Sequence, residues 1–294
     1  MKMRTKIILL ICLVALGALL ISKRVQIMEV VQGWQQPALP AAVSYEEIVG
    51  REEVGREEVG REDKIIKEPK PVDINLNLPE AGEEQEELKT DDTELEELSD
   101  GWPAQMNLAV PFTPQAPFSN WDLPFQEACE EASVYMVHEY YQGTPGGRIG
   151  AEAAEQALLK IVEYENALFG DYLDTSAAQT AILVEQMYGY GRVDLLANPT
   201  VEQIKEQIAA GRPVIVPAAG QQLHNPYFTQ PGPLYHMLVI RGYTEKGFIT
   251  NDPGTRHGEG YFYPFETLMS ALHDWNGGDV DNGQKIILII YPEN

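Results

Sequence analysis

An acidic segment without aromatic residues, from about Tyr45 to Asp100, limits what this chain can fold into. The segment is rich in Glu and Asp, and no aromatic residue follows Tyr45 until Trp102. It cannot bury enough apolar surface to offset the entropy lost on ordering, so we expect it to be disordered. Aromatic residues are then frequent as far as Tyr291. Roughly 190 residues remain for one folded domain, which is enough for a real core.

We therefore divide the 294-residue chain into residues 1–26, a signal anchor or signal peptide, residues 27–104, an acidic linker, and residues 105–294, the folded domain. The linker contains the repeat VGREE–VGREE–VGRED, from Val49 to Asp63. A glycine in every copy argues against a stable helix, so the repeat is interpreted as a spacer. Self-repulsion of the charges should extend the linker into a tether.

The N-terminus has the pattern of a membrane-targeting segment. An apolar run, Ile7–Ile21, is flanked on both sides by Lys and Arg. The run is short for a spanning helix, which needs about 20 residues, but basic flanking side chains can snorkel and extend it. Because no small-residue cleavage site follows at once, we favour an uncleaved anchor over a cleaved signal peptide. The basic residues before the run place the domain outside the cytoplasm, attached to the cell membrane, or secreted if the signal is cleaved.

The charge balance argues against nucleic acid as a partner. The formal net charge is −24, and no basic stripe is present to meet phosphates. No P-loop or dinucleotide fingerprint occurs. A histidine-only metal site from His224, His236 and His257 lacks helical or hairpin spacing, so no metal or other cofactor is expected.

The folded part is predicted to place its helices before most of its strands. A first strand is expected in NLAVPFTPQAPF, followed by a helix in WDLPFQEACEEASVYMVHEYYQG that ends at Gly143. Further helices are expected at residues 150–168, 176–188, 200–210 and 264–273. Strands are expected in PVIVPA, LYHMLVIRGY, KGFITND, GYFYPF and QKIILIIYP. This order predicts an α+β domain with a mostly antiparallel sheet.

Cys129 is the cysteine with potential chemistry. The chain has two cysteines, and Cys12 lies within the apolar N-terminal run. A disulfide inside the domain and a zinc-ribbon site are therefore excluded. Cys129 is expected early in its helix, where free backbone N–H groups lower the pKa of a thiol. Glu130 and Glu131 would raise that pKa if they faced the sulfur, but we expect them to face solvent. A buried filler cysteine is the alternative interpretation.

Two downstream residues could complete a thiol nucleophile. His236 interrupts the apolar strand Leu234–Ile240, where it must satisfy a buried hydrogen bond or act as a base. Asp252 follows one hairpin later and could accept the other ring N–H, which would fix the tautomer. Asn251 could do the same, but neighbouring strand residues point in opposite directions. Asp252 also suits an Asx turn in NDPG.

Acyl transfer also needs hydrogen-bond donors for the oxyanion. Gln115 lies at the end of the first expected strand, and Gln126 lies at the start of the cysteine helix. The backbone N–H of Cys129 would be the other donor. The residues alone leave both glutamines open.

The order VPFTPQ … EACEEAS … HMLVIRGY … NDPG resembles the papain-like cysteine peptidase superfamily. It is similar to the branch related to the bacteriocin-processing, double-glycine leader peptidases and their stand-alone bacterial relatives. The resemblance covers Leu108 to Pro292. It implies a papain-like fold, with N-terminal helices packed on a mostly antiparallel sheet. It also implies that Cys129 is the nucleophile and His236 the base. It implies further that Asp252 is the orienting carboxylate and Gln115 the oxyanion glutamine.

The chain departs from this family in two places. Ala-Cys-Glu stands where the family often has Cys-Gly-Pro or Asp-Cys-Gly. The gap from Gln115 to Cys129 is longer than the compact pattern, so Gln126 remains a rival. No transporter segments follow, so the substrate of an export-coupled leader peptidase is not implied.

The sequence thus predicts a membrane-tethered, extracytoplasmic thiol peptidase that hydrolyses peptide bonds in a peptide or protein substrate. Two alternatives remain. One is a catalytically inactive peptide- or cell-wall-binding module of the same fold. The other is a transamidase or amidase that uses the same thioester chemistry.

Overall fold

The computed structural model describes residues 36–52 and 102–292. The anchor expected at residues 1–26 and most of the linker expected at residues 27–104, including most of the repeat, lie outside the described residues. Within the two described ranges, no helix is long and apolar enough to cross a membrane. Residues from Leu39 onward belong to one compact unit.

A seven-stranded antiparallel sheet forms the centre of this unit. Its strand order is β2-β7-β3-β4-β5-β6, and β1 pairs with β4. The strands are β1 (Met106–Asn107), β2 (Arg192–Ala197), β3 (Val214–Ala219), β4 (Tyr235–Tyr243), β5 (Gly247–Asn251), β6 (Tyr261–Pro264) and β7 (Ile286–Tyr291). The predicted mixture of helices with a mostly antiparallel sheet is confirmed, although the first expected strand shrinks to two residues.

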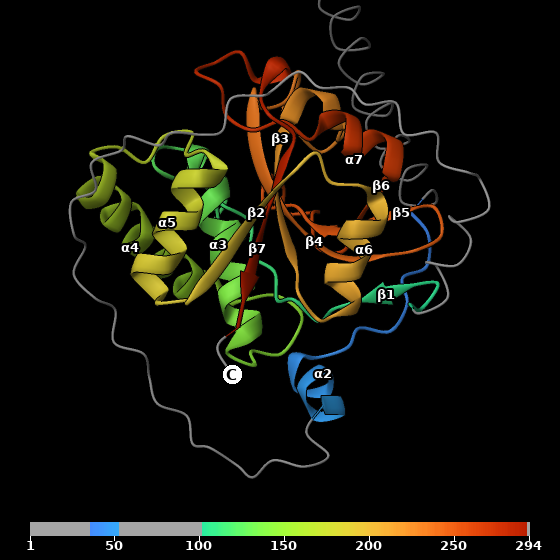
Figure 1. Ribbon diagram of the computed structural model, residues 1–294. Helices are drawn as coiled ribbons and strands as arrows, with labels where there is room; N and C mark the ends of the chain where they lie inside the picture. Colours follow the sequence, from blue (N-terminus) through green and yellow to red (C-terminus); the bar gives the residue numbers. More distant parts are fainter. Residues whose placement is uncertain (1–35, 53–101, 293–294) are drawn as a thin grey trace, which may run out of the picture. The chain divides into compact units, whose positions relative to one another are not determined.

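The helices flank the sheet on two sides (Figure 1). Three gather on one side: α3 (Cys129–Tyr141), α4 (Ala151–Phe169) and α5 (Ala177–Tyr188). Two lie on the other: α6 (Val201–Ala209) and α7 (Phe265–Ala271). Three short 3₁₀ helices are η1 (Phe125–Glu127), η2 (Gly220–Leu223) and η3 (Val280–Asn282). Local sequence explains where α5 and α6 begin, because Ser176 with Gln179 and Thr200 with Gln203 form capping boxes.

Strand β4 is the element on which the site depends. Every residue of β4 is buried, because β3 and β5 pair with it and α3 and α6 pack against it. Its apolar side chains join those of β3, β7 and α3 in one hydrophobic core. Since α3 packs on β4, the first residue of α3, Cys129, is brought close to the N-terminal end of β4, where His236 lies.

A short N-terminal strap, residues 39–52, packs on the domain. It contains α2 (Tyr45–Glu52), which starts at a Ser44–Glu47 capping box. Val43 forms a parallel β-bridge with Leu108. The Tyr45 ring lies against two tyrosine rings of α3, with centroid distances of 5.5 and 5.2 Å. Residues 39–52, which the sequence analysis assigns to the linker, therefore pack on the domain in the structure.

Candidate active site

Cys129 occupies the first position of helix α3, directly after η1. Its thiol is free, and 6% of the residue is exposed. The first backbone N–H groups of a helix have no intrahelical partner, so the Cys129 N–H is available as a donor beside the sulfur. The expectation that Cys129 lies at a helix start is met.

His236 and Asp252 form a buried pair. The Nε2 atom of His236 lies 2.8 Å from Oδ1 of Asp252, and 1% and 0% of these residues are exposed. Asn251 points elsewhere, because its amide donates to the backbone oxygens of Val110 and Pro111, each at 3.1 Å. Of the two neighbouring candidates, Asp252 is thus the one that contacts the imidazole.

Three further donors hold the Asp252 carboxylate. The Tyr263 hydroxyl donates to Oδ2 at 2.6 Å, and the Asn225 amide donates to the same oxygen at 3.0 Å. The backbone N–H of Gly254 donates to Oδ1 at 3.0 Å. Burial alone would raise the pKa of Asp252. The charge of His236 and the hydrogen bonds from His236, Tyr263 and Gly254 outweigh burial, and the pKa lies below its ordinary value.

Sequence reasoning missed Asn225 and Tyr263. Tyr263 lies in β6 and Asn225 follows η2, so neither is near Asp252 in the chain. The alternation of GYFYPF predicts an inward side chain at one of its aromatic positions, but not its hydrogen-bond partner. No local signal marks Asn225.

The imidazole of His236 is tightly packed between Phe228 and Gly254. The Phe228 ring meets it edge-on, with a centroid distance of 5.3 Å. A Cβ atom at Gly254 would lie 2.9 Å from His236 Cε1 and 2.8 Å from Phe228 Cε1. Only glycine lets the backbone approach the ring so closely, which fixes the ring plane between Phe228 and the turn after Asp252.

The Cys129 sulfur lies beside β4 but is hydrogen-bonded to a carboxyl group. The backbone N–H of Met237, the residue after His236, interacts with the sulfur. Among the described residues, no hydrogen bond joins the sulfur to the His236 imidazole. The thiol instead donates to Oε2 of Glu130 at 2.9 Å. Burial, followed by the charge of Glu130, its hydrogen bond and the charge of Glu131, raises the pKa of Cys129 well above its ordinary value.

The expectation that Glu130 and Glu131 face solvent is wrong. Only 1% and 0% of these residues are exposed. Helix α3 is packed on β4, α4 and α5, so its first turn has no wide solvent face. Burial is the main cause that raises the pKa of both carboxyl groups well above the ordinary value.

Glu131 meets a second buried acid, Glu165 of α4. The two carboxyl groups interact, and none of their four oxygen atoms has another hydrogen-bond partner among the described residues. A hydrogen bond between them would require that one of them carry a proton. Among the described residues, no Lys, Arg or His forms an ion pair with either. Burial raises the pKa of Glu165 to about 8.

The two candidate glutamines differ in environment. Gln115 is 4% exposed, and its Nε2 donates to the backbone oxygens of Phe125 and Gln126 at 3.0 and 2.8 Å. Its backbone N–H donates to Pro253 at 2.9 Å, so Gln115 links the turn after Asp252 to the residues before Cys129. Gln126 is exposed, and its amide donates to Glu127 at 3.0 Å.

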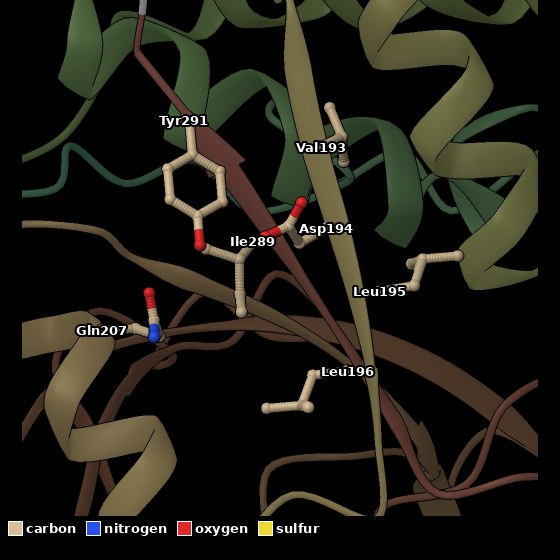
Figure 2. Close-up of a pocket in the computed structure, with 7 residues that line it drawn as sticks. All are labelled: Val193, Asp194, Leu195, Leu196, Gln207, Ile289 and Tyr291. Carbon is tan, nitrogen blue, oxygen red and sulfur yellow. The ribbon is translucent and has the colours of Figure 1, made fainter.

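A pocket of about 380 Å³ lies elsewhere, between β2, β7 and α6 (Figure 2). No residue predicted for the site lines it. Across residues 36–52 and 102–292, no group of three His, Cys, Asp or Glu side chains is arranged to hold a metal ion.

A free thiol at a helix start, next to a strand whose histidine is paired with a buried aspartate, is the set of groups that thiol-dependent acyl-transfer enzymes use. The chain belongs to the Peptidase_C39 like family, whose family model matches residues 107–277. The expected resemblance to papain-like cysteine peptidases is confirmed by this match. No curated protein matches the sequence.

Similar solved structures were also found. A Bacillus anthracis protein described as a C39-like peptidase is 16% identical, with 65% of this chain and 99% of that chain covered and a TM-score of 0.43. Prevotella intermedia prointerpain A is 12% identical, with 66% and 74% covered and a TM-score of 0.43. The active interpain A cysteine protease of the same organism is 13% identical, with 64% and 95% covered and a TM-score of 0.39. The family assignment rests on the sequence match.

Proposed function

We propose that this chain is a thiol peptidase that hydrolyses peptide bonds through an acyl-enzyme on Cys129. His236 acts as the base, and Asp252 orients it. The observation that carries the proposal is the buried 2.8 Å contact between Asp252 and His236, because His236 lies on β4, the strand that the Cys129 helix packs against. The match to a peptidase family supports the reaction class.

The geometry suggests how the proton moves. Nε2 of His236 is engaged by Asp252, so Nδ1 is the ring nitrogen available to the thiol. The thiol S–H bond breaks and Nδ1 takes the proton, while the sulfur attacks the substrate carbonyl carbon. His236 then gives this proton to the leaving amine as the C–N bond breaks. Water hydrolyses the thioester with His236 again as the base.

Two donors would stabilise the oxyanion: the backbone N–H of Cys129 and the amide of Gln115. Gln115 is the better candidate because it is buried and bonded to the residues just before Cys129, whereas Gln126 is exposed. Both Gln115 amide contacts are backbone oxygens of η1. A substrate would therefore have to displace one of them for Gln115 to act in this way.

Exposed apolar side chains in the segments that precede Cys129 and His236 are proposed as the substrate rim. Phe118, Trp121 and Leu123 are 58%, 44% and 61% exposed, and Leu234 is 51% exposed. Phe118, Trp121 and Leu123 come from one short segment, and clustered exposed apolar residues mark binding surfaces. An extended peptide with apolar side chains is the substrate class that such a rim would accept.

The test has two parts on the full-length protein. Wild type should cleave members of a mixed peptide library, detected by mass spectrometry, and Cys129→Ala should cleave none. Iodoacetamide at mildly acidic pH should label Cys129 faster in wild type than in His236→Ala. Equal labelling in the two proteins would refute the role of His236. Turnover that occurs only with an added amine would assign transamidation instead, and binding without turnover would assign an inactive module.

We also propose that residues 1–26 anchor the chain in the cell membrane and that the acidic linker holds the domain outside the cytoplasm. The apolar run and its basic flanks support this topology. Protease added to intact cells should release the domain while the N-terminus stays in the membrane fraction. A domain that is protected until the cells are lysed would contradict this orientation.

A further inference from the structure

Glu130 is a buried carboxyl group in direct contact with the reacting sulfur. Its Oε2 atom lies 2.9 Å from Cys129 Sγ, and 1% of the residue is exposed. The protonation states of a carboxyl group and a thiol this close together are coupled. An ionised Glu130 accepts the S–H proton in a hydrogen bond and opposes a second negative charge. A neutral Glu130 instead donates its own O–H to a thiolate.

The surroundings of Glu130 are acidic from every side. No Lys, Arg or His is among the described groups whose charge acts on it. The titratable groups that face Glu130 are Cys129 and Glu131 on α3, Glu165 on α4, Asp174 in the segment after α4, and Tyr235 on β4. A buried carboxylate without a cation is costly, so Glu130 favours its neutral form.

We propose that Glu130 is a further catalytic residue, which donates a hydrogen bond to the Cys129 thiolate when neutral and holds Cys129 as a thiol when ionised. This inference rests on the proposed function, in which Cys129 is the nucleophile. In the active form the thiol proton moves from sulfur to His236 Nδ1, while the Glu130 O–H bond stays intact and points at the sulfur. When Glu130 loses its proton as pH rises, its negative charge disfavours the thiolate, and Cys129 keeps its S–H bond.

The experiment measures the alkylation rate of Cys129 against pH in the full-length protein. The Cys129 peptide is quantified by mass spectrometry, so Cys12 does not interfere. Glu130→Gln keeps the shape and can donate to a thiolate through its amide, but it cannot ionise. We expect the ratio of the rate in E130Q to that in wild type to rise by about tenfold or more between about pH 5 and about pH 9, which corresponds to at least one pKa unit.

Glu127→Gln is the matched control. It removes the same charge two residues before Cys129, from a side chain that is partly exposed and contacts Gln126. Its rate ratio to wild type should stay constant with pH. A constant ratio for E130Q as well, in a variant with a wild-type circular dichroism spectrum, would overturn the proposal.

His236→Ala provides a second measurement if E130Q does not fold. It removes the imidazole, which is the other proton partner of the thiol in the proposed mechanism. The coupling to Glu130 requires that the alkylation rate of Cys129 in His236→Ala still follow two titration steps, and a single step would exclude it. The proposed function is tested independently, because peptide turnover is measured separately on wild type. A two-step profile in His236→Ala with no peptide turnover by wild type would keep the coupling between Glu130 and Cys129 and remove peptide hydrolysis.

Discussion

Two groups of buried carboxyl residues flank the candidate nucleophile and base, and they differ in how burial is compensated. Asp252 receives hydrogen bonds from His236, Tyr263, Asn225 and the Gly254 N–H. The acidic cluster of α3 and α4, which comprises Glu130, Glu131 and Glu165, has no cationic partner among the described residues. The pKa of Asp252 is lowered, whereas the pKa of each glutamate is raised.

This contrast divides the site into two halves. The fixed half comprises His236, Asp252 and the donors Tyr263, Asn225 and Gly254, and the titrating half comprises Glu130, Glu131 and Glu165. Asp252 stays ionised wherever the domain is folded near neutral pH, so the orientation of His236 does not change with pH. The pKa of each glutamate is raised, to about 8 for Glu165, and these residues belong to or touch the helix that starts at Cys129. Changes of pH in the range where these carboxyl groups titrate therefore act on the nucleophile and its helix.

The strongest test of the fixed half is Asp252→Asn. The asparagine has no charge to orient and stabilise the imidazolium, and its amide hydrogens would face groups that are themselves donors. We expect kcat/KM for a peptide that wild type cleaves to fall by about 10²- to 10⁴-fold. The exposed Asp279→Asn provides the matched control and should leave the rate unchanged. A loss below about tenfold would show that His236 keeps its tautomer without Asp252.

Much of the fixed half could be predicted from the sequence because its signals are local. A histidine inside the apolar run of β4 and an aspartate at the end of β5 each stand out against their neighbours. Strand alternation already indicated that only one of Asn251 and Asp252 would reach His236. Tyr263 and Asn225 escaped prediction because their only distinctive property is a partner far away in the chain.

The titrating half could not be predicted for the opposite reason. Glutamates in the first turn of a helix suit its dipole and usually face solvent, so their local pattern indicates exposure. Burial of Glu130 and Glu131 depends on α4 and β4 packing around that turn, and no sequence period reports this packing. The strap was missed in the same way, since Tyr45 and Ile48 are isolated apolar residues at the edge of an acidic segment.

The second test, Glu131→Gln, concerns the titrating half. Because the folded-state pKa of Glu131 and Glu165 lies above the ordinary value of 4.5, the pair contributes stability that is fully present below about pH 4.5. That stability is lost as pH rises through the folded-state pKa, which is about 8 for Glu165. A glutamine at position 131 can donate its amide to Glu165 and needs no shared proton.

We therefore expect the free energy of unfolding of E131Q to fall less steeply with pH than that of wild type. The difference in slope should be about 1 kcal/mol per pH unit between about pH 5 and about pH 8, close to the value for one proton. Urea unfolding at a series of pH values measures it. Glu163→Gln removes an exposed carboxylate from α4, the helix that carries Glu165, and should keep the wild-type slope. Parallel curves for E131Q and wild type would show that the two carboxyl groups share no proton.

The smallest expected effect belongs to Tyr263→Phe, which removes one of the four donors to Asp252 and also the acceptor of a 2.8 Å hydrogen bond from the Asn225 amide. Hydrogen bonds to charged groups contribute about 1.5–3 kcal/mol, so kcat/KM should fall by about tenfold to a hundredfold. Tyr261→Phe is the control, because this hydroxyl lies on the same strand without a hydrogen bond to Asp252. The loss should appear mainly in kcat, since Tyr263 acts through Asp252 and His236 rather than on the substrate. If the loss appears in KM alone, or equally in both tyrosine variants, then Tyr263 shapes the site without supporting the charge of Asp252, and the contrast with the glutamate cluster rests on His236, Asn225 and Gly254.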